Sequence, residues 1–453
     1  MTIEAKPLAP KTLAPIGTTE RIRGVDIARG LALLGILLVN VRFFFTPLGT
    51  SIDPTVPLPG VDWTMTDAIV WSVVEALCSF KFISLFSILF GFGLAMQATR
   101  AADAGDTRWG PGLRRLGLLL AIGLFHGLFV WYGDILTLYA CVGVIILCCA
   151  RLSPRTLLIA AGVVAGITLF ISVAAASMQW IIASFPEPFD PPELTAAIEE
   201  ARAAEEAAAA AAAAAGELNA PRGWQAMTEA NFDVRSPTWI SAEIAAMREG
   251  PFLDALLFRA TNFIFSYIAA IFGYGWHVLT MMLFGVYALR SGLFTSDPNA
   301  SRRRRKIALI AGAVGLPAAL LAPGAFWIFG LESPAAAFWH LVLLEVGALS
   351  LPLAYASVII EWGPRLPAFL ATALERTGRM SLTVYLSESI LCTALASWWG
   401  FALFGTMSDV RLSLIALVVW TVLVVAATLW LQRFSIGPLE WLWRRATYMR
   451  NPA

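Results

Sequence analysis

Apolar stretches long enough to cross a bilayer recur along most of the chain, and short polar connections separate them. A membrane core about 30 Å thick needs roughly 20 apolar helical residues for each crossing. The pattern therefore predicts an all-α fold, a polytopic transmembrane helical bundle of about ten spans. The predicted spans are residues 27–45, 70–98, 112–131, 134–151, 157–184, 275–291, 307–328, 336–360, 380–400 and 411–432.

The arginines orient these spans. Under the positive-inside rule, connections that are rich in Arg and Lys stay in the cytoplasm. Every second connection is basic, and so are both flanks of the bundle, so we expect both termini to be cytoplasmic. The basic segments are residues 21–29, 100–115, 151–155, 302–306, 365–379 and 444–450.

The apolar segment 251–272 is a candidate for one more crossing. It contains Asp254, Arg259 and Asn262. A crossing there would also move the basic run Arg302–Lys306 to the outside, against the positive-inside rule. We therefore expect 251–272 to be an interfacial or half-inserted helix.

This layout divides the chain into four regions. Residues 1–22 lack the apolar core of a signal peptide and are expected to be a disordered cytoplasmic tail. Residues 23–184 are predicted to be an N-terminal bundle of five spans, and residues 251–453 a C-terminal bundle of the interfacial helix plus five spans. Residues 185–250, acidic and rich in Ala and Glu, are predicted to be an extracytoplasmic insert that serves as a spacer or as a lid.

Composition agrees with a lipid environment. Hydrophobic residues make up 58% of the chain and charged residues 14%, against about 25% charged in soluble domains. The expected partner is therefore the lipid bilayer. No basic stripe with interleaved aromatics indicates nucleic acid, three histidines and no ligand-spaced cluster indicate no metal, and the pattern fixes no oligomeric state.

Ionisable and amide residues inside a membrane are costly and usually functional. Two predicted spans repeat one spacing, since Asn40 follows Arg29 by eleven residues and His126 follows Arg115 by eleven. Eleven residues turn a helix about 20° beyond three full turns and advance it about 16 Å. Each polar residue therefore shares a face with its arginine. If the two helices pack together, Asn40 and His126 reach a similar depth and are expected to converge on one polar cavity.

His126 is the main candidate for chemistry. Histidine transfers protons near neutral pH, and Gly123 and Gly127 on either side permit the close approach of another helix. The alternative is a structural histidine held by one hydrogen bond. Asp134, after Gly133 at the predicted outer end, either caps the next helix or orients a substrate hydroxyl.

Further polar residues are candidates for a substrate path, with structural pairing as the alternative. Asp26 and Arg29 are spaced for an ion pair. Glu75 and Lys81 are six residues apart and do not share a helix face, so each is expected to pair with another helix.

The later spans add weaker candidates. Tyr385 and Glu388 lie on one face of the ninth predicted span, and Glu345 lies near the middle of the membrane. His277 and His340 fall close to the outer ends of their predicted spans.

Several motifs resemble one family of membrane proteins. The opening helix reads Arg23-Gly-Val-Asp-Ile-Ala-Arg-Gly and continues to Asn40. The later motifs are Leu85-Phe-Ser-Ile-Leu-Phe-Gly-Phe-Gly93, Arg114-Arg115 followed by His126-Gly127 and Gly133-Asp134, Gly378-Arg-Met-Ser-Leu-Thr-Val-Tyr-Leu386, and Phe434-Ser-Ile-Gly-Pro-Leu-Glu-Trp-Leu-Trp-Arg444. Together they resemble the domain of unknown function 418, or YeiB-like, family over nearly the whole chain outside 185–250.

That family in turn resembles the transmembrane acyltransferases, which include acyltransferase family 3 and the heparan-α-glucosaminide N-acetyltransferase group. Their opening helix also carries a polar residue eleven positions after an Arg-Gly pair. In the heparan group this residue is an asparagine, as is Asn40 here. The catalytic histidine of that group follows eleven residues further on, where this chain has Ser51. The resemblance does not assign the base in this chain; His126 is our candidate for that role because of its position in a predicted span.

The resemblance implies an acyltransferase of the bacterial cytoplasmic (inner) membrane. An acyl-CoA donor, a co-substrate and not a tightly bound cofactor, would approach from the cytoplasm, and a hydroxyl or amine acceptor on a glycan or lipid would approach from the outer half. His126 would act as general base and Asn40 would orient the acyl carbonyl or the imidazole. Arg29, Arg114 and Arg115 would hold donor phosphates, which guanidinium groups suit.

The alternative function is that of a transporter or lipid-binding permease that uses the same buried polar residues. A chain of about ten spans with a buried titratable group fits a carrier as well. The sequence has no internal repeat of the kind common in carriers, which favours the acyltransferase.

Overall fold

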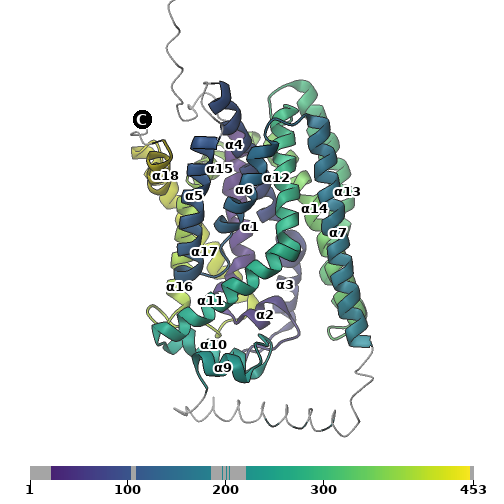
Figure 1. Cartoon of the computed structure of the whole chain (residues 1–453), viewed down its shortest axis with the longest axis vertical. Helices are drawn as coiled ribbons and strands as arrows, with labels where there is room; N and C mark the ends of the chain where they lie inside the picture. Colours follow the sequence, from purple (N-terminus) through teal and green to yellow (C-terminus); the bar gives the residue numbers. More distant parts are fainter. Residues whose placement is uncertain are drawn as a thin grey trace, which may run out of the picture.

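The computed structural model describes residues 22–103, 109–184, 196, 200, 204 and 221–448. Within these residues the chain is all-α, without a strand, and its helices pack side by side as a bundle (Figure 1). The N-terminal elements are α1 (Arg23–Phe45), α2 (Leu48–Ile52), α3 (Met65–Leu77), α4 (Lys81–Asp103), α5 (Trp109–Phe125), the π-helix η2 (His126–Val130), α6 (Leu136–Cys149) and α7 (Pro154–Ser184). The later elements are α9 (Gly223–Glu229), α10 (Pro237–Glu249), α11 (Phe252–Ala269), the π-helix η3 (Ala270–Tyr274), α12 (Gly275–Arg290), α13 (Pro298–Phe329), α14 (Pro334–Trp362), the 3-10 helix η4 (Gly363–Arg365), α15 (Ala368–Arg379), α16 (Ser381–Ala396), α17 (Asp409–Arg433) and α18 (Pro438–Tyr448).

The predicted transmembrane helical bundle is confirmed. In the described part of the chain, 8 helical segments are long and apolar enough to cross a membrane, and α6 and α16 are shorter apolar helices. Each of these segments overlaps one of the predicted spans. The cytoplasmic side of the termini and the division into regions stay predictions.

The two ends of the bundle carry different elements (Figure 1). Helices α15 and α18 lie at one end, and α9 and α10 lie at the other. Arg23, at the start of α1, donates to Glu375 of α15 at 2.9 Å, so both ends of the described chain share one end of the bundle. Most of the Ala/Glu-rich stretch of the 185–250 insert lies outside the described residues.

Helix α1 is central and crosses α15 at very short range. A Cβ atom at Gly30 would lie 2.1 Å from the Leu374 carbonyl oxygen, and one at Gly378 would lie 1.8 Å from the Asp26 carbonyl oxygen. Real side chains cannot approach backbone that closely, so both positions require glycine. This crossing places the Asp26 and Arg29 side chains beside the end of α15.

The predicted span 70–98 is interrupted. Helix α3 ends at Leu77 and α4 begins at Lys81, with Phe80 between them in the left-handed region at φ 60°. The break lets the Lys81 ammonium turn back and donate to the Glu75 carbonyl oxygen at 3.0 Å. Because of this break, Lys81 of α4 bonds to the backbone of α3, a separate helix, where the prediction assumed one unbroken helix. Glu75 contacts His340 of α14 at 3.5 Å, and so does pair with another helix.

The segment 251–272 does not form a separate crossing. Helix α11 continues through η3 into α12, so the chain runs as one candidate span from Phe252 to Arg290. Arg259 donates to the Phe129 carbonyl oxygen at 3.2 Å and Asn262 to Glu243 at 2.7 Å, so both side chains have a partner inside the protein. His277 therefore lies within a continuous span and not near its end, contrary to the prediction.

Candidate functional site

Two cavities lie end to end inside the bundle. The first, which we call the arginine-lined cavity, has a volume of about 220 Å³ and lies beside the start of α1 and α18. The second, the large cavity, has a volume of about 1040 Å³ and reaches the opposite end of α1. Ile36, Ile83 and Ile135 line both cavities, so three aliphatic side chains form the barrier between them.

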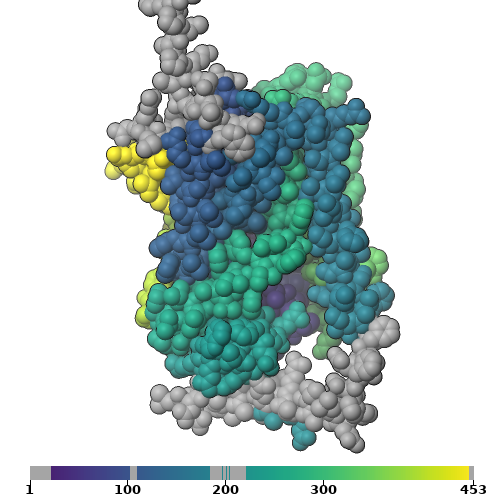
Figure 2. Space-filling view, in the orientation of Figure 1, coloured from purple at the N-terminus to yellow at the C-terminus, as the bar shows by residue number. Residues whose placement is uncertain are grey.

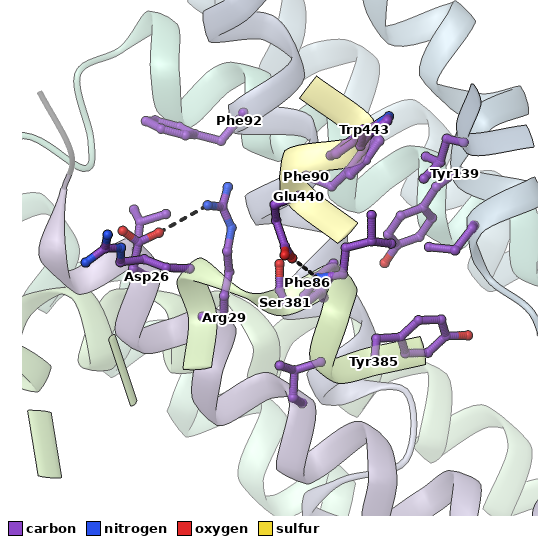
Figure 3. A pocket seen from close by; sticks show the side chains of 18 of the residues that line it. Asp26, Arg29, Phe86, Phe90, Phe92, Tyr139, Ser381, Tyr385, Glu440 and Trp443 are labelled. Carbon is purple, nitrogen blue, oxygen red and sulfur yellow. Dashed lines mark hydrogen bonds and ion pairs between the residues drawn. The ribbon is translucent and has the colours of Figure 1, made fainter. Parts of the chain in front are cut away.

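The arginine-lined cavity has an excess of positive groups. Four guanidinium groups and two carboxylates line it; they belong to Arg29, Arg115, Arg379 and Arg444, and to Asp26 and Glu440. Arg29 donates to Asp26 at 3.2 Å, as Figure 3 shows. Guanidinium forks match phosphate geometry, so this cavity suits an anionic group.

Helix α18 closes this cavity on one side (Figure 3). Glu440 accepts from the backbone N–H groups of Leu382 at 2.8 Å and Thr383 at 3.0 Å. It therefore caps the start of α16, where a carboxylate satisfies orphan donors and the helix dipole. The Arg115 guanidinium lies 4.2 Å from the centroid of the Trp443 ring, a cation–π contact. Both contacts hold α18 over the mouth of the cavity.

Five carboxylates, two guanidinium groups and one imidazole line the large cavity, and several of these groups are paired. Arg42 donates to both carboxylate oxygens of Asp409, at 3.0 and 2.9 Å. The other ion pairs in its wall are Arg235–Asp53 at 3.5 Å and His340–Glu75 at 3.5 Å. The aromatic rings of Trp71, Trp131, Tyr132, Tyr267 and Tyr274 also line this cavity. Aromatic rings beside polar groups and an excess of carboxylates suit a polar ligand that carries no negative charge.

The large cavity also reaches the side of the bundle. Gln179 of α7 and Ser266 of α11 both line it. In Figure 2 a hollow opens between α7 and α11, and the purple N-terminal part of the chain is visible inside it. A ligand therefore has a lateral way in as well as one from the end of the bundle.

His126 and Asp134 form a buried pair beside the large cavity. His126 Nδ1 lies 3.0 Å from Asp134 Oδ1, and the two side chains are 2% and 0% exposed. His126 begins the π-helix η2, a feature that is frequent at functional sites. Its Nε2 atom is buried and has no hydrogen-bond partner among the described residues.

Two glycines make this arrangement possible. A Cβ atom at Gly127 would lie 2.1 Å from the Phe263 ring, and one at Gly123 would lie 2.8 Å from Asp134 Oδ2. The close approach that the sequence predicted at these glycines is confirmed. Asp134 Oδ2 also accepts from the backbone N–H of Thr137 at 2.8 Å, so Asp134 both caps α6 and orients His126.

Tyr385 lies beside His126, and Glu388 is buried on the same helix, α16. The Tyr385 ring centroid is 5.4 Å from that of His126, and Tyr385 also lines the arginine-lined cavity. Tyr385 therefore separates the imidazole from that cavity. Glu388 is 2% exposed and its Oε1 has no hydrogen-bond partner in the described part of the chain.

The candidate residues are divided between the two cavities. Those in the wall of the arginine-lined cavity are Asp26, Arg29, Arg115 and Tyr385, and those in the wall of the large cavity are Asn40, Glu75 and Asp134. His126, Lys81 and Glu388 are buried and line neither. Asn40 and His126 thus do not share one cavity wall; Asp134 is the link between them.

Arg114 is exposed and does not line the arginine-lined cavity. Its Nε lies 3.4 Å from the Gly110 carbonyl oxygen of its own helix. The Arg114-Arg115 pair therefore contributes one arginine to the cavity and one to the surface.

Sequence reasoning missed three residues of the arginine-lined cavity. Arg379 and Arg444 were assigned to topology alone, although both lie in the quoted family motifs. Nothing in the sequence pattern marked Tyr139 as a cavity residue. Its hydroxyl lies 2.7 Å from Ser87 Oγ, and only the packing of α6 against α4 places it at the cavity.

The fold and the two cavities define a class: a polytopic, all-helical membrane protein with an arginine-lined cavity and a large cavity placed end to end. Residues 288–450 match the family model described as protein of unknown function (DUF418). The chain is 27% identical to YxaH of Bacillus subtilis (strain 168), over 97% of each chain. It is 29% identical to YeiB of Escherichia coli (strain K12), over 94% of this chain and 96% of the relative.

A third relative is the 39.9 kDa protein in the amylase 3′ region of Bacillus acidopullulyticus. It is 34% identical over 36% of this chain and 43% of its own length. No solved structure matches. These matches support the resemblance to the DUF418 and YeiB-like family.

Proposed function

We propose that this protein is an integral membrane acyltransferase that moves an acyl group from an acyl-CoA-type donor to a hydroxyl or amine acceptor. The observation that supports this most is the buried His126–Asp134 pair. Its Nε2 has no partner among the described residues, and it lies between a cavity for an anion and a cavity for an uncharged ligand. We further propose that this site lies in the bacterial cytoplasmic membrane.

The donor would occupy the arginine-lined cavity. Its phosphates would bind the guanidinium groups of Arg29 and Arg115, in a cavity whose four arginines outnumber its two carboxylates. The thioester would then extend along α1 toward Ile36, which lines both cavities. This placement puts the reactive carbonyl at the barrier between the cavities.

His126 has the geometry of a general base. The Nδ1–H group donates to Asp134, which leaves the lone pair of Nε2 free to accept a proton. The acceptor N–H or O–H proton passes to Nε2 while the acceptor atom forms a bond to the thioester carbon. The C–S bond breaks, and the leaving thiolate takes the proton back from Nε2 as CoA thiol, so the histidine ends as it began.

Asn40 and the large cavity would serve the acceptor. Asn40 lines that cavity together with Asp134, and its amide would bind the acceptor or the acyl carbonyl. Access to Nε2 requires a shift of a neighbouring side chain, and Tyr385 is the candidate because it covers the imidazole on the donor side.

The direct test is acyl-CoA turnover by purified protein in lipid nanodiscs. We expect thioester cleavage that depends on Asp134. Asn at 134 can still cap α6 but cannot hold His126 as a base, so Asp134→Asn should lower turnover by about 10²-fold or more. Equal turnover in the folded Asn variant would reject the role of the pair.

One observation supports transport as a second candidate function. Two cavities at opposite ends with a thin apolar barrier, here Ile36, Ile83 and Ile135, are what alternating access requires. Flux of an uncharged polar solute into proteoliposomes without any acyl-CoA, together with no thioester cleavage, would favour transport over acyl transfer.

A further inference from the structure

The lateral opening of the large cavity lies between two candidate membrane spans. One span is Pro154–Ala183, which is formed by α7, and the other is Phe252–Arg290, which contains α11. Helix α7 packs against α12 and α14, whereas α11 slopes away from α7 in Figure 1. The hollow in Figure 2 lies where these two helices diverge. Because both helices belong to candidate spans, this side of the cavity faces lipid.

One face of each helix borders the opening. On both sides the residues that line the cavity are spaced i, i+3 and i+4, which places them on one helix face. They are Gln179, Ile182 and Ala183 on one side, and Ser266, Ala269 and Ala270 on the other. Four of the six are apolar, and Ile182 is 67% exposed, so this face of α7 is open to its surroundings. An apolar passage with two polar groups suits hydrocarbon chains that are attached to a polar headgroup.

The opening also lies at the depth of a lipid headgroup. Ala183 is the last residue of its candidate span, and Gln179 lies about 6 Å from it along the helix. The ends of a span lie where the hydrocarbon core meets the headgroup region. A lipid in that leaflet can therefore place its headgroup inside the large cavity while its chains stay between α7 and α11.

The interior of the cavity fits a sugar better than a small polar group. Its volume of about 1040 Å³ is at the upper end of the range of pockets that hold drug-sized ligands. The rings of Trp71, Tyr267 and Tyr274 line it. A sugar ring has C–H groups on its faces and hydroxyls at its edge, so it can pack on aromatic rings and still form hydrogen bonds. The Tyr132 and Tyr274 hydroxyls, both on residues of this wall, have no partner among the described residues.

The charges in the wall disfavour a phosphate. The two guanidinium groups are already paired, Arg42 with Asp409 at 2.9 Å and Arg235 with Asp53 at 3.5 Å. The five carboxylates outnumber the two guanidinium groups and the one imidazole, so an anionic headgroup would meet like charge. A hydroxyl carries no charge and donates a hydrogen bond, which carboxylates accept.

We propose that the acceptor is a membrane lipid with an uncharged, polyhydroxylated headgroup, a glycolipid, which enters the large cavity sideways between α7 and α11. Its role as acceptor rests on the proposed acyl transfer, whereas its binding does not. Asn40 and Asp134, in the same wall, would contact the headgroup. A headgroup oxygen forms the bond to the acyl carbon, the C–S bond breaks, and the hydroxyl proton ends on the CoA thiol.

Photolabelling of the full chain in nanodiscs tests the binding. The probes are monoglucosyl diacylglycerol, phosphatidylglycerol and phosphatidylethanolamine, each with the same diazirine near the glycerol end of one chain. We expect the glucosyl lipid to label peptides of α7 and α11 at least about tenfold more than phosphatidylglycerol, because like charge disfavours the anionic headgroup. Equal labelling by all three would mean surface lipid only and would overturn the proposal. Preferential labelling by phosphatidylethanolamine would also overturn it, in favour of an amine headgroup.

A pair of neighbouring residues tests the lateral route. Ala269→Trp places an indole in the opening, and Ile268→Trp is the matched control, because Ile268 is 49% exposed and does not line the cavity. Labelling by the glucosyl lipid should fall several-fold in Ala269→Trp and stay unchanged in Ile268→Trp. Ala183→Trp, with Ile181→Trp as its control, repeats the test from the α7 side if Ala269→Trp does not fold. Unchanged labelling in a folded variant with a blocked opening would reject the route.

The labelling needs no acyl-CoA, so its outcome can be separated from that of the proposed function. Specific labelling by the glucosyl lipid without any acyl transfer would reject the proposed function and leave the lipid site standing. Acyl transfer to the water-soluble methyl glucoside, with no specific lipid labelling, would reject the lipid site and leave the proposed function standing.

Discussion

Two histidine–carboxylate pairs in one bundle differ in a single partner. His126 with Asp134 and His277 with Glu345 have Nδ1–oxygen distances of 3.0 and 2.8 Å, and both imidazoles are 2% exposed. His277 Nε2 is held by Ser84, whereas His126 Nε2 has no partner among the described residues. The comparison shows that His277 has a partner at each ring nitrogen, whereas His126 keeps one nitrogen that can accept a proton.

The largest effect is expected from a change at His126. His126→Gln should lower acyl-transfer turnover about 10²- to 10⁴-fold, the usual contribution of a general base. Acyl-CoA affinity and melting temperature should change little, because the arginine-lined cavity is intact. Turnover and calorimetric binding in nanodiscs measure both quantities, and normal turnover would show that His126 is structural.

The matched change on the other side is His277→Gln. Glutamine cannot reproduce both ring contacts of His277, with Ser84 and with Glu345, so breaking this buried pair should lower the free energy of unfolding by about 3–5 kcal/mol. Turnover per folded molecule should stay close to wild type. Denaturant unfolding of the reconstituted protein measures the first quantity, and a loss of turnover without a loss of stability would erase the distinction between the two histidines.

A comparison of the neighbouring residues Arg114 and Arg115 tests whether the arginine-lined cavity binds the donor. Arg115→Ala removes one charge-assisted contact to a donor phosphate, worth about 1.5–3 kcal/mol, so acyl-CoA affinity should fall roughly tenfold or more. Arg114→Ala is the control, because Arg114 is exposed and outside the cavity wall. Calorimetry should separate the two variants, and equal losses would point to a nonspecific effect of charge.

A smaller effect concerns Glu243, in the cap formed by α9 and α10. It accepts from Leu48, Trp239 and Asn262, but burial outweighs these bonds and raises the pKa of Glu243 from 4.5 to about 7. Because the folded pKa lies above the unfolded one, its contribution to stability is full below 4.5 and is lost as pH rises through about 7.

The melting temperature should therefore fall as pH rises through neutrality. In Glu243→Gln this decrease should be reduced, because a neutral amide replaces the titrating group and Asn262 can reverse its amide to pair with it. Fluorescence-detected melting at a series of pH values measures the difference. Equal slopes in both proteins would show that Glu243 is not the titrating group.

The pattern of apolar and polar residues predicted most of the fold but only part of the candidate site. Long apolar runs predicted the spans, since the bilayer fixes helix length whatever the packing. The residues Asp26, Arg29, Asn40 and His126 were found because polar groups in a membrane stand out in any sequence. Asp134 and Tyr385 were candidates too, but their contacts with His126 were not predicted, because those contacts depend on how the chain packs around it.

The sequence by itself determined the helical membrane class, the candidate polar positions and the close helix approach at Gly123 and Gly127. These depend on composition, spacing and side-chain size along one chain. Tertiary structure alone decided that Lys81 turns back toward Glu75 and that Arg115, not Arg114, lines a cavity. It also decided that both ring nitrogens of His277 have hydrogen-bond partners, whereas Nε2 of His126 has none among the described residues. The physical reason is that hydrogen-bond partners in a helical bundle come from other helices, and their choice depends on breaks and crossings that no one-dimensional period contains.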